Sequence, residues 1–548
     1  MSDGPLVVQS DKTLMIEVDL PGAAECRNAI AAFAELERAP EHVHTYRITP
    51  LGLWNARAAG MDAKSVMDAL TTFSRFPVPA SLLADLTETM GRYGRLVLEK
   101  DPSHPLVLRS CDRAVLEEVL GSRLTAGMFG PRLDAERVVV LLGERGRLKQ
   151  ALLKLGWPAD DQAGYVDGTR HAISLREEGG FALRAYQSEA VDVFMASGSG
   201  TVVLPCGAGK TLVGLAAMAR CSASTLILVT NTVSARQWRS EIFAHSSVTE
   251  EQIGEYSGER KEIRPVTVAT YQILSTRSKG EYRHFGVFDA QDWGLVIYDE
   301  VHLLPAPVFR MTAEIQSRRR LGLTGTLVRE DGREGDVFSL IGPKRFEAPW
   351  KLMEEQGWIA PALCTEVRVT LSDAERMTYA LTEAAKRHSV ASTSAAKDRA
   401  IEFLVRKHDG EPTLVIGMYL EHLSRIADML QAPLITGKTP VLERERLYDA
   451  FRSGKERVLV VSNVANFSID LPDASVAVQV SGTFGSRQEE AQRLGRILRP
   501  KADRRQARFF TVVSRDTNEQ EFAARRQRFL AEQGYPYEIV DAEDLVGV

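Results

Sequence analysis

From about residue 176 onward, short apolar runs alternate with amphipathic stretches of helical length. The first runs are Thr201–Leu204, Thr225–Val229, Val266–Ala269, Leu295–Tyr298 and Leu321–Leu323. Short continuous apolar runs are typical of strands that are buried on both faces, as in parallel sheets covered by helices. The pattern therefore predicts an α/β lobe over residues 176–350.

The same alternation resumes in the last third of the chain. Its apolar runs are Thr413–Ile416, Pro433–Thr436, Val458–Val461, Val476–Val480 and Phe509–Val513. We therefore expect a second parallel-sheet lobe over residues 351–548. A polar, helical stretch at about 371–407 precedes these runs and is predicted to be a helical insertion in that lobe.

The first 175 residues predict two smaller α+β regions, 1–90 and 91–175. The expected elements are a hairpin from Leu6–Gln9 and Thr13–Val18, helices at Ala63–Phe73 and Ala80–Met90, strands at Arg95–Leu98 and Leu106–Leu108, a helix at Asp112–Leu120, a strand at Val138–Leu142 and a helix at Arg145–Leu155. Two helices followed by a hairpin suggest a winged helix that contacts DNA. A generic packing module is an equally good interpretation.

Composition narrows the class of protein. The chain has 548 residues, of which 44% are hydrophobic and 26% charged, as in ordinary soluble proteins of several domains. A net charge of −5 means that any nucleic-acid binding must use local basic clusters. The five cysteines lack C-x-x-C spacing, which argues against zinc and iron–sulfur sites. With no signal-peptide pattern and no membrane-length apolar run, we expect a cytoplasmic protein without membrane association.

The first chemical motif is a glycine-rich turn between a predicted strand and a predicted helix. Its residues are Leu204, Pro205, Cys206, Gly207, Ala208, Gly209, Lys210 and Thr211. Backbone N–H groups of such a turn cradle phosphates, the lysine reaches the β/γ-phosphates, and the Thr hydroxyl holds Mg²⁺. Leu204 replaces the usual first glycine of this motif. A dinucleotide-binding G-x-G-x-x-G motif is excluded, because position 212 is Leu.

The second motif is a pair of carboxylates, Asp299 and Glu300, at the end of the apolar run Leu295–Tyr298. Alone, such a pair is usually a solvated turn. Following a buried strand of the lobe that carries the phosphate loop, Asp299 suits a magnesium shell and Glu300 suits a base for the attacking water. His302 is predicted to link the phosphate state to its neighbours.

The third motif lies in the second lobe, at Gln492–Arg499. Arg496 and Arg499 are three residues apart and would share one helix face. An arginine pointed at a transferring phosphate stabilises the charge that develops in the transition state. Without the first two motifs, a salt-bridged surface helix would be the better interpretation.

Together these residues resemble the XPB family of superfamily 2 DNA repair helicases, in its shorter bacterial form. The matching segments are 204–211, Asp299–His302, 323–326, Arg329–Asp331, 467–472, 492–499, the entry motif 183–187 and the N-terminal 46–51. The triplet Arg329, Glu330, Asp331 is the mark specific to this family. Gly325 and Asn463 depart from the Ala and Lys usual in the family.

The resemblance implies two RecA-like lobes that use ATP and Mg²⁺, a damage-recognition-like domain at 91–175 and a thumb-like insertion at 371–407. It assigns Arg184, Gln187 and Asp470 to the nucleotide and Gln492, Arg496 and Arg499 to catalysis. It assigns DNA contact or coupling to Asn231, Thr232, Arg236, Thr270, Thr324, Gly325, Thr326, Arg329, Glu330, Asp331, Thr436, Gly437, Ser462 and Asn463. The implied activity is ATP-driven 3′-5′ movement along DNA or duplex opening, in nucleotide excision repair, beside a nuclease or another repair partner.

Three alternatives are weaker. An RNA helicase usually carries Ser-Ala-Thr where this chain has Thr324, Gly325 and Thr326. A restriction-type translocase would need a fused nuclease or methyltransferase, for which there is no motif. A DNA-binding scaffold without enzymatic activity is disfavoured by the intact Lys210 and Glu300.

Overall fold

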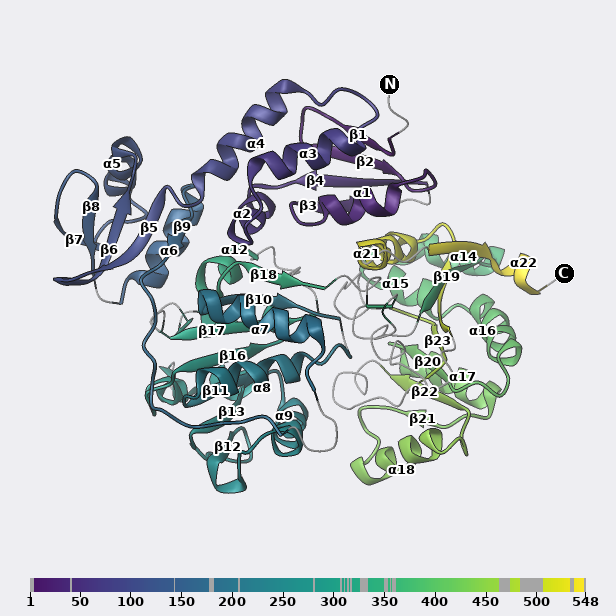
Figure 1. The fold of residues 1–548 in the computed structure, drawn as a ribbon. Helices are drawn as coiled ribbons and strands as arrows, with labels where there is room; N and C mark the ends of the chain where they lie inside the picture. The colour runs from purple at the N-terminus through teal and green to yellow at the C-terminus, as the bar shows by residue number, and fades with distance from the viewer. Residues whose placement is uncertain are drawn as a thin grey trace. The chain divides into compact units, whose positions relative to one another are not determined.

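The computed structural model divides into two compact units, one formed mainly by residues 1–348 and the other mainly by residues 349–548. It describes residues 4–39, 42–141, 143–176, 182–205, 207–278, 281–305, 308–309, 311–312, 315, 318–325, 334–348, 353–354, 356, 361–462, 474–482, 506–532 and 537–546. Figure 1 shows the order of the elements along the chain. Within these ranges, no helix is long and apolar enough to cross a membrane.

Lobe 1 is built on a seven-stranded parallel sheet with the order β12-β13-β11-β16-β17-β10-β18. The strands are β10 (Ser199–Val203), β11 (Thr225–Val229), β12 (Ile253–Tyr256), β13 (Val266–Thr270), β16 (Leu295–Asp299), β17 (Arg319–Thr324) and β18 (Lys344–Glu347). Its helices and short helical turns are α7 (Ala185–Ser197), α8 (Lys210–Cys221), α9 (Thr232–His245), η2 (Glu250–Gln252), α10 (Tyr271–Leu274), η3 (Phe285–Phe288), η4 (Val301–Leu303), α12 (Glu334–Asp336) and η5 (Val337–Ile341). A small antiparallel pair, β14 (Arg277–Ser278) and β15 (Glu281–Tyr282), lies outside this sheet.

Lobe 2 has a second seven-stranded parallel sheet, with the order β21-β22-β20-β23-β24-β19-β25. Its strands are β19 (Ala362–Val369), β20 (Thr413–Gly417), β21 (Leu434–Ile435), β22 (Val458–Ser462), β23 (Val476–Gln479), β24 (Ala507–Ser514) and β25 (Tyr537–Asp541). Its helices are α14 (Asp373–Leu381), α15 (Ala384–Ser392), α16 (Ala396–Lys407), α17 (Leu420–Leu430), α18 (Val441–Arg452), α21 (Asn518–Glu532) and α22 (Ala542–Val546). The predicted α/β fold with two parallel sheets is confirmed.

The N-terminal residues form two separate sheets. The first has the order β1-β2-β4-β3, from β1 (Leu6–Val8), β2 (Thr13–Glu17), β3 (Ala34–Arg38) and β4 (Val43–Ile48), with helices α1 (Ala23–Ile30), α2 (Pro50–Ala58), α3 (Ala63–Phe73) and α4 (Ala80–Arg92). The second has the order β7-β8-β6-β5-β9, from β5 (Leu96–Asp101), β6 (His104–Ser110), β7 (Phe129–Arg132), β8 (Arg137–Val140) and β9 (Ala159–Asp161), with helices α5 (Arg113–Gly121) and α6 (Arg145–Lys154).

The winged-helix interpretation of the N-terminal region needs correction. The helices α3 and α4 pack with each other and with other elements of the first N-terminal region, α3 against β1 and α4 against α2. The hairpin β5–β6 instead lies inside the five-stranded second sheet, paired with β8 and β9. The reason is long-range strand pairing: β9, far along the chain, covers the edge that a wing would leave open.

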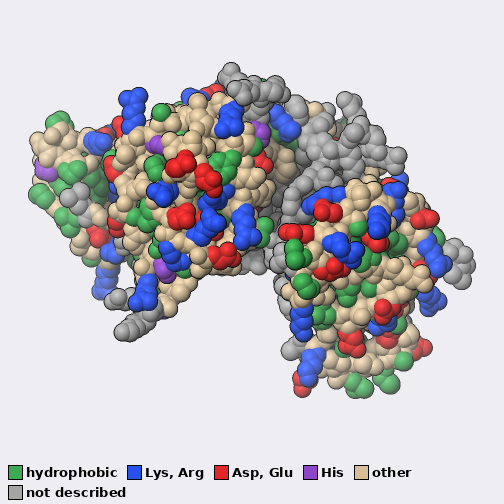
Figure 2. Space-filling model, turned by 90° about the horizontal axis from the view of Figure 1, so that it is seen from below, with side chains coloured by type: hydrophobic (Ala, Val, Ile, Leu, Met, Phe, Trp, Pro, Cys, Tyr) green, Lys and Arg blue, Asp and Glu red, His purple; other side chains and the backbone are tan. Residues whose placement is uncertain are grey.

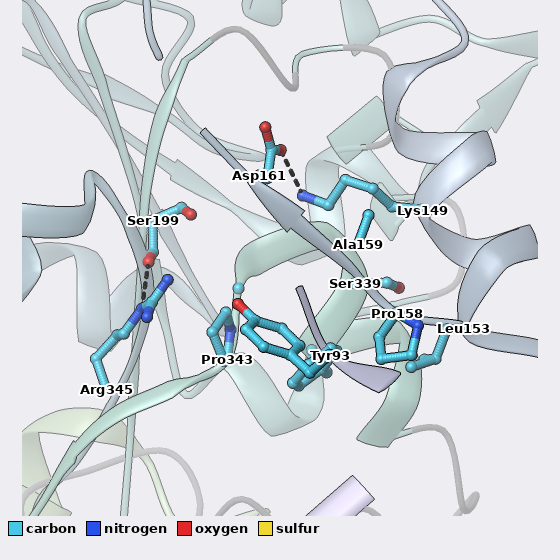
Figure 3. Close-up of a pocket in the computed structure, with 12 residues that line it drawn as sticks. Tyr93, Lys149, Leu153, Pro158, Ala159, Asp161, Ser199, Ser339, Pro343 and Arg345 are labelled. Carbon is cyan, nitrogen blue, oxygen red and sulfur yellow. Dashed lines mark hydrogen bonds and ion pairs between the residues drawn. The ribbon is translucent and has the colours of Figure 1, made fainter. Parts of the chain in front are cut away.

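The second N-terminal region meets lobe 1 at a buried group of charges. The Asp161 carboxylate accepts from the Arg145 guanidinium at 2.6 Å and from the Lys149 ammonium at 3.1 Å. The Asp161 side chain is only 8% exposed. Arg145 and Arg320 of lobe 1 both stack on the Tyr165 ring, with 5.4 Å to its centroid. Figure 3 shows Lys149 and Asp161 beside Tyr93 and the lobe 1 residues Ser199 and Arg345.

This ion cluster predicts a large effect of one isosteric change. Asp161→Asn leaves the two cations buried without a counter-charge, so it should destabilise the protein by about 3–5 kcal/mol. Thermal unfolding measures the effect. The matched control is Asp160→Asn, since Asp160 is only half-buried and an amide oxygen still accepts from the Tyr93 hydroxyl. Equal melting temperatures for the two variants would contradict the role given to the cluster.

Candidate functional site

The candidate site lies where three neighbouring parallel strands end. In the register of the sheet, Val203 of β10 is level with Thr324 of β17, and Asp299 of β16 is level with Leu323. The Leu204 N–H donates to the Thr324 carbonyl at 2.9 Å and extends this pairing by one residue. The carboxyl ends of parallel strands form the usual ligand crevice of open α/β sheets. The phosphate loop, the carboxylate pair and the Thr324 segment are thereby brought together.

The phosphate loop has the backbone that its glycines predict. Gly207 and Gly209 have φ values of 83° and 78°, in the left-handed region that glycine adopts without strain. Gly209 is the N-cap of α8, so Lys210 and Thr211 are the first residues of that helix. Their position at the positive end of the helix suits phosphate binding.

Of the two predicted adenine-side residues, Gln187 packs on this loop and Arg184 contacts its neighbours in the entry motif. Gln187 is buried, and its side-chain oxygen accepts from the Arg184 N–H at 2.9 Å. A Cβ on Gly209 would stand 2.4 Å from the Gln187 amide nitrogen, so the amide packs closely on the loop. The Arg184 guanidinium donates to the Tyr186 hydroxyl at 3.0 Å. The entry motif and the phosphate loop therefore form one packed unit.

Glu300 is held toward the loop by an ion pair. Its carboxylate lies 3.1 Å from the Lys210 ammonium and 3.5 Å from Nδ1 of His302. The Glu300 backbone has φ 49°, a conformation that costs a non-glycine residue about 1–3 kcal/mol. The Glu300 N–H donates to Oδ1 of Asp299 at 3.1 Å. The surrounding contacts therefore hold the two carboxylates in a fixed relative position.

The two carboxylates have opposite electrostatic surroundings. Burial and the neighbouring Glu300 charge raise the pKa of Asp299 to about 6, against the opposing effects of Lys210 and the Trp238 N–H. Burial would also raise the pKa of Glu300, but Lys210, His302 and the Gly325 N–H outweigh it and hold that pKa below its usual value. Glu300 therefore stays ionised near neutral pH, while ionisation of Asp299 is less favourable than that of an exposed aspartate.

His302 joins this site to the end of β17. The His302 side chain is almost fully buried, and its Nδ1 lies 2.6 Å from the Thr324 hydroxyl. Gly325, the next residue, donates its N–H to Glu300. The segment of Thr324 and Gly325, predicted to couple nucleotide state to DNA, thus contacts both His302 and Glu300.

The donor set fits a magnesium ion. Mg²⁺ prefers oxygen ligands and is usually held by one or two carboxylates together with nucleotide phosphates. Asp299 supplies a carboxylate whose charge a divalent cation would stabilise, and Thr211 supplies a hydroxyl on the first turn of α8.

The DNA-contact candidates of lobe 1 lie at the same edge of the sheet. Asn231 and Thr232 follow β11, and Asn231 caps α9 by accepting from the Ser234 N–H at 2.9 Å. Arg236 is exposed and pairs with Glu259 at 3.2 Å. Thr270 ends β13 and caps α10, but its side chain is only 1% exposed. Its hydroxyl is thus committed to the protein rather than displayed.

In lobe 2, three predicted DNA-contact residues are described. Thr436 and Gly437 follow β21, and the Thr436 N–H donates to the Thr439 hydroxyl. Ser462 ends β22 and is buried. The remaining predicted site residues lie outside the described residues: Cys206, Thr326, Arg329, Glu330, Asp331, Asn463, Asp470, Gln492, Arg496 and Arg499.

Two residues that sequence reasoning missed contact Asp299. The Trp238 indole N–H donates to Oδ2 of Asp299 at 2.9 Å, and the Tyr271 hydroxyl donates to the Asp299 carbonyl at 2.9 Å. Trp238 lies within α9 and Tyr271 begins α10. A buried tryptophan or tyrosine usually finds a polar partner, but only the tertiary structure shows which one.

The charge on Asp299 predicts a pH-dependent gain in stability for Asp299→Asn. A carboxyl whose folded pKa is raised binds more protons folded than unfolded, so its ionisation destabilises the fold as pH rises from about 4 to above 6. In EDTA, Asp299→Asn should differ least from wild type at pH 4 and be more stable than wild type at pH 8. The gain should be about 1 kcal/mol, because the half-buried carboxylate is partly screened by water. Thermal unfolding at both pH values tests this, and a less stable variant at pH 8 would contradict it.

Comparison with known proteins assigns the chain to a family. A model described as "ERCC3/RAD25/XPB C-terminal helicase" matches residues 353–546, "Type III restriction enzyme, res subunit" matches 180–329, and "Helicase conserved C-terminal domain" matches 6–134. A "DNA 3'-5' helicase XPB" of Kineococcus radiotolerans is 68% identical over 100% of this chain and 98% of its own length. A protein of the same name from Mycobacterium tuberculosis is 66% identical over 100% of both chains. With these identities over the full length and the site described above, the chain belongs to the XPB family of DNA 3′-5′ helicases.

Proposed function

We propose that this member of the DNA 3′-5′ helicase family opens or moves along duplex DNA in nucleotide excision repair, using ATP hydrolysed at lobe 1. The observation that supports it best is the Lys210–Glu300 ion pair beside the phosphate loop, at 3.1 Å. Full-length relatives at 68% and 66% identity carry the name DNA 3'-5' helicase XPB. Repair, lesion sensing and the nuclease or other partner rest on the family resemblance alone.

In this proposal Lys210 exchanges one anion for another. Its ammonium lies 3.1 Å from the Glu300 carboxylate. The β/γ-phosphates of ATP would draw Lys210 away and leave the Glu300 carboxylate to accept a proton from the attacking water. The proximity of His302 and the Gly325 N–H keeps Glu300 ionised for this task.

The metal and nucleotide assignments follow the same geometry. Asp299 and Thr211 would hold Mg²⁺, which when bound neutralises phosphate charge. Gln187 and Arg184 would bind the adenine side, where Gln187 already packs on Gly209. The family resemblance adds Asp470 for the nucleotide, and Gln492, Arg496 and Arg499 for stabilising the transition state.

The DNA would be held mainly through its backbone. Asn231, Thr232 and Arg236 in lobe 1, and Thr436, Gly437 and Asn463 in lobe 2, are the proposed contacts, whereas Thr270 and Ser462 are buried and are left out. On the face shown in Figure 2, the coloured basic and acidic side chains are interspersed. Contacts made through polar groups at strand and helix ends would give binding without sequence preference that weakens as salt rises.

ATPase assays without nucleic acid, with DNA and with RNA separate the candidate functions. A DNA helicase or translocase predicts stimulation by DNA and little by RNA. Stimulation by RNA alone would favour an RNA helicase, and absence of any hydrolysis would favour a DNA-binding scaffold. A restriction-type translocase stays a weaker alternative, although a model of that class matches residues 180–329.

Replacing Glu300 tests the hydrolytic assignment. Glu300→Gln should retain ATP binding and lose roughly 10²-fold or more of turnover, because an amide cannot accept the proton from water. Nucleotide binding and steady-state ATPase rates measure the two effects. Glu251→Gln removes an equal charge at an exposed position of lobe 1 and should keep wild-type turnover. Near-normal ATPase in Glu300→Gln would refute the assignment.

The triplet Arg329, Glu330 and Asp331 is proposed to couple hydrolysis to duplex opening. Arg329→Ala should impair opening of a forked duplex more than it impairs DNA-stimulated ATPase. Strand separation and ATPase are measured on the same substrate, with Arg260→Ala as an exposed arginine control in lobe 1. Equal losses of both activities would indicate general damage and count against coupling.

A further inference from the structure

Two segments that carry predicted DNA contacts converge on a single residue of the ATP site. The helix α9 begins directly after Asn231, and α10 begins directly after Thr270. From within these helices, Trp238 donates to the Asp299 carboxylate and Tyr271 donates to the Asp299 carbonyl, both at 2.9 Å. The carboxylate of Asp299 is therefore fixed by the segment that follows Asn231, and its main chain by the segment that follows Thr270.

The side chains of Trp238 and Tyr271, which donate to Asp299, are closely packed. Trp238 is 2% exposed and Tyr271 is 3% exposed. A Cβ added to Gly214 of α8 would stand 2.5 Å from the Trp238 ring and 3.4 Å from the Leu323 side chain. Glycine at this position lets the ring reach Asp299 between α8 and the sheet. Because close-packed interiors transmit small displacements, a shift of α9 would move the donor on Asp299.

The link also reaches the other hydrolytic group. Oδ1 of Asp299 accepts from the Glu300 N–H, and Oδ2 accepts from the Trp238 indole N–H. Each carboxylate oxygen is therefore held by a donor of its own. Hydrogen bonds to charged groups are stronger than those between neutral groups, and a misplacement of about 1 Å in a catalytic group can cost roughly 10²-fold in rate. Small motions at α9 and α10 would thus be felt in turnover.

We infer that Trp238 and Tyr271 are positioning residues that make the placement of Asp299 depend on DNA held at the start of α9: Trp238 carries the carboxylate, and Tyr271 anchors the main chain against which the carboxylate moves. The inference rests on the proposed function, since that function assigns Asp299 to magnesium and Asn231 to DNA. It adds a physical route by which DNA stimulates hydrolysis. A purely structural role for the two side chains would instead predict equal effects on turnover with and without DNA.

The kinetic test uses Trp238→Phe and Tyr271→Phe, which keep the rings and remove the donors. Loss of one hydrogen bond to the Asp299 carboxylate should lower DNA-stimulated turnover about tenfold in Trp238→Phe. Basal turnover should fall less than DNA-stimulated turnover, so that the ratio of the two rates falls, while KM for ATP and the affinity for a forked DNA should stay within about twofold to threefold of wild type. Tyr271→Phe should show the same selectivity and provides a second measurement if Trp238→Phe unfolds.

The matched controls remove equivalent donors elsewhere in lobe 1. Trp293 is also buried and donates its indole N–H to the Val287 carbonyl at 2.9 Å, and the Tyr256 hydroxyl lies 2.9 Å from His284. Trp293→Phe and Tyr256→Phe should leave DNA stimulation at the wild-type level. Full DNA stimulation in both Trp238→Phe and Tyr271→Phe would overturn the inference, as would loss of stimulation in the controls as well.

A spectroscopic readout is independent of turnover. The six tryptophans can be labelled with 5-fluorotryptophan, and the ¹⁹F signal that disappears in Trp238→Phe identifies Trp238. Without nucleotide or Mg²⁺, forked DNA should shift the Trp238 signal and leave that of Trp293 in place. A Trp238 signal that stays unchanged while the DNA is bound would overturn the inference.

Asn231→Asp distinguishes failure of the inference from failure of the proposed function. An aspartate keeps an oxygen that caps α9 and repels a phosphate. The variant should bind DNA more weakly and lose the DNA-induced shift of the Trp238 signal. Unchanged DNA affinity would refute the proposed contact at Asn231, and the inference with it. Weaker DNA binding, combined with full stimulation of Trp238→Phe and Tyr271→Phe at saturating DNA, would refute the inference alone.

Discussion

The parallel pairing of β10, β16 and β17 is the constraint on which the rest of the site depends. Parallel strands in register end at one edge, so three short segments far apart in sequence become neighbours. The Lys210 ammonium can then reach Glu300 at 3.1 Å, and His302 can reach Thr324 at 2.6 Å. A register slip of one residue would turn the strand side chains Asp299 and Thr324 to the other face of the sheet.

Charge at this edge is balanced in a way that suits a nucleotide. Lys210 stabilises Glu300, while Asp299 has a pKa raised to about 6. The site thus contains one carboxylate that an ion pair stabilises, Glu300, and one whose ionisation is unfavourable, Asp299. Such an arrangement is typical of functional sites. A second buried charge group, around Asp161, has no excess carboxylate and instead joins the second N-terminal region to lobe 1. The group of Lys210, Asp299 and Glu300 suits catalysis, and the group around Asp161 suits the packing of the second N-terminal region on lobe 1.

Much of the fold could be predicted from the sequence, because its signals are local. The run Thr225–Val229 is β11 and Ala63–Phe73 is α3, with the predicted bounds. Periodicity failed where the strand has no continuous run of apolar residues. The edge strands β12 and β18 and the short strands β7 and β9 lack an apolar run, and they form because a neighbouring strand offers unpaired backbone groups. For the same reason, the winged-helix interpretation grouped the hairpin β5–β6 with the helices α3 and α4, whereas the hairpin pairs with β8 and β9.

The sequence by itself determined the chemistry: a phosphate loop ending in Lys210 and Thr211, and the carboxylates Asp299 and Glu300 after a buried strand. Spacing and residue type suffice there, because the loop and the strand end are local structures. Only the tertiary structure decided what surrounds them. That Trp238 and Tyr271 donate to Asp299, that Gln187 packs on Gly209, and that Arg320 is buried near Tyr165 depend on contacts between distant elements. No local pattern encodes such contacts, because they are fixed by sheet order and by close packing between helices and strands.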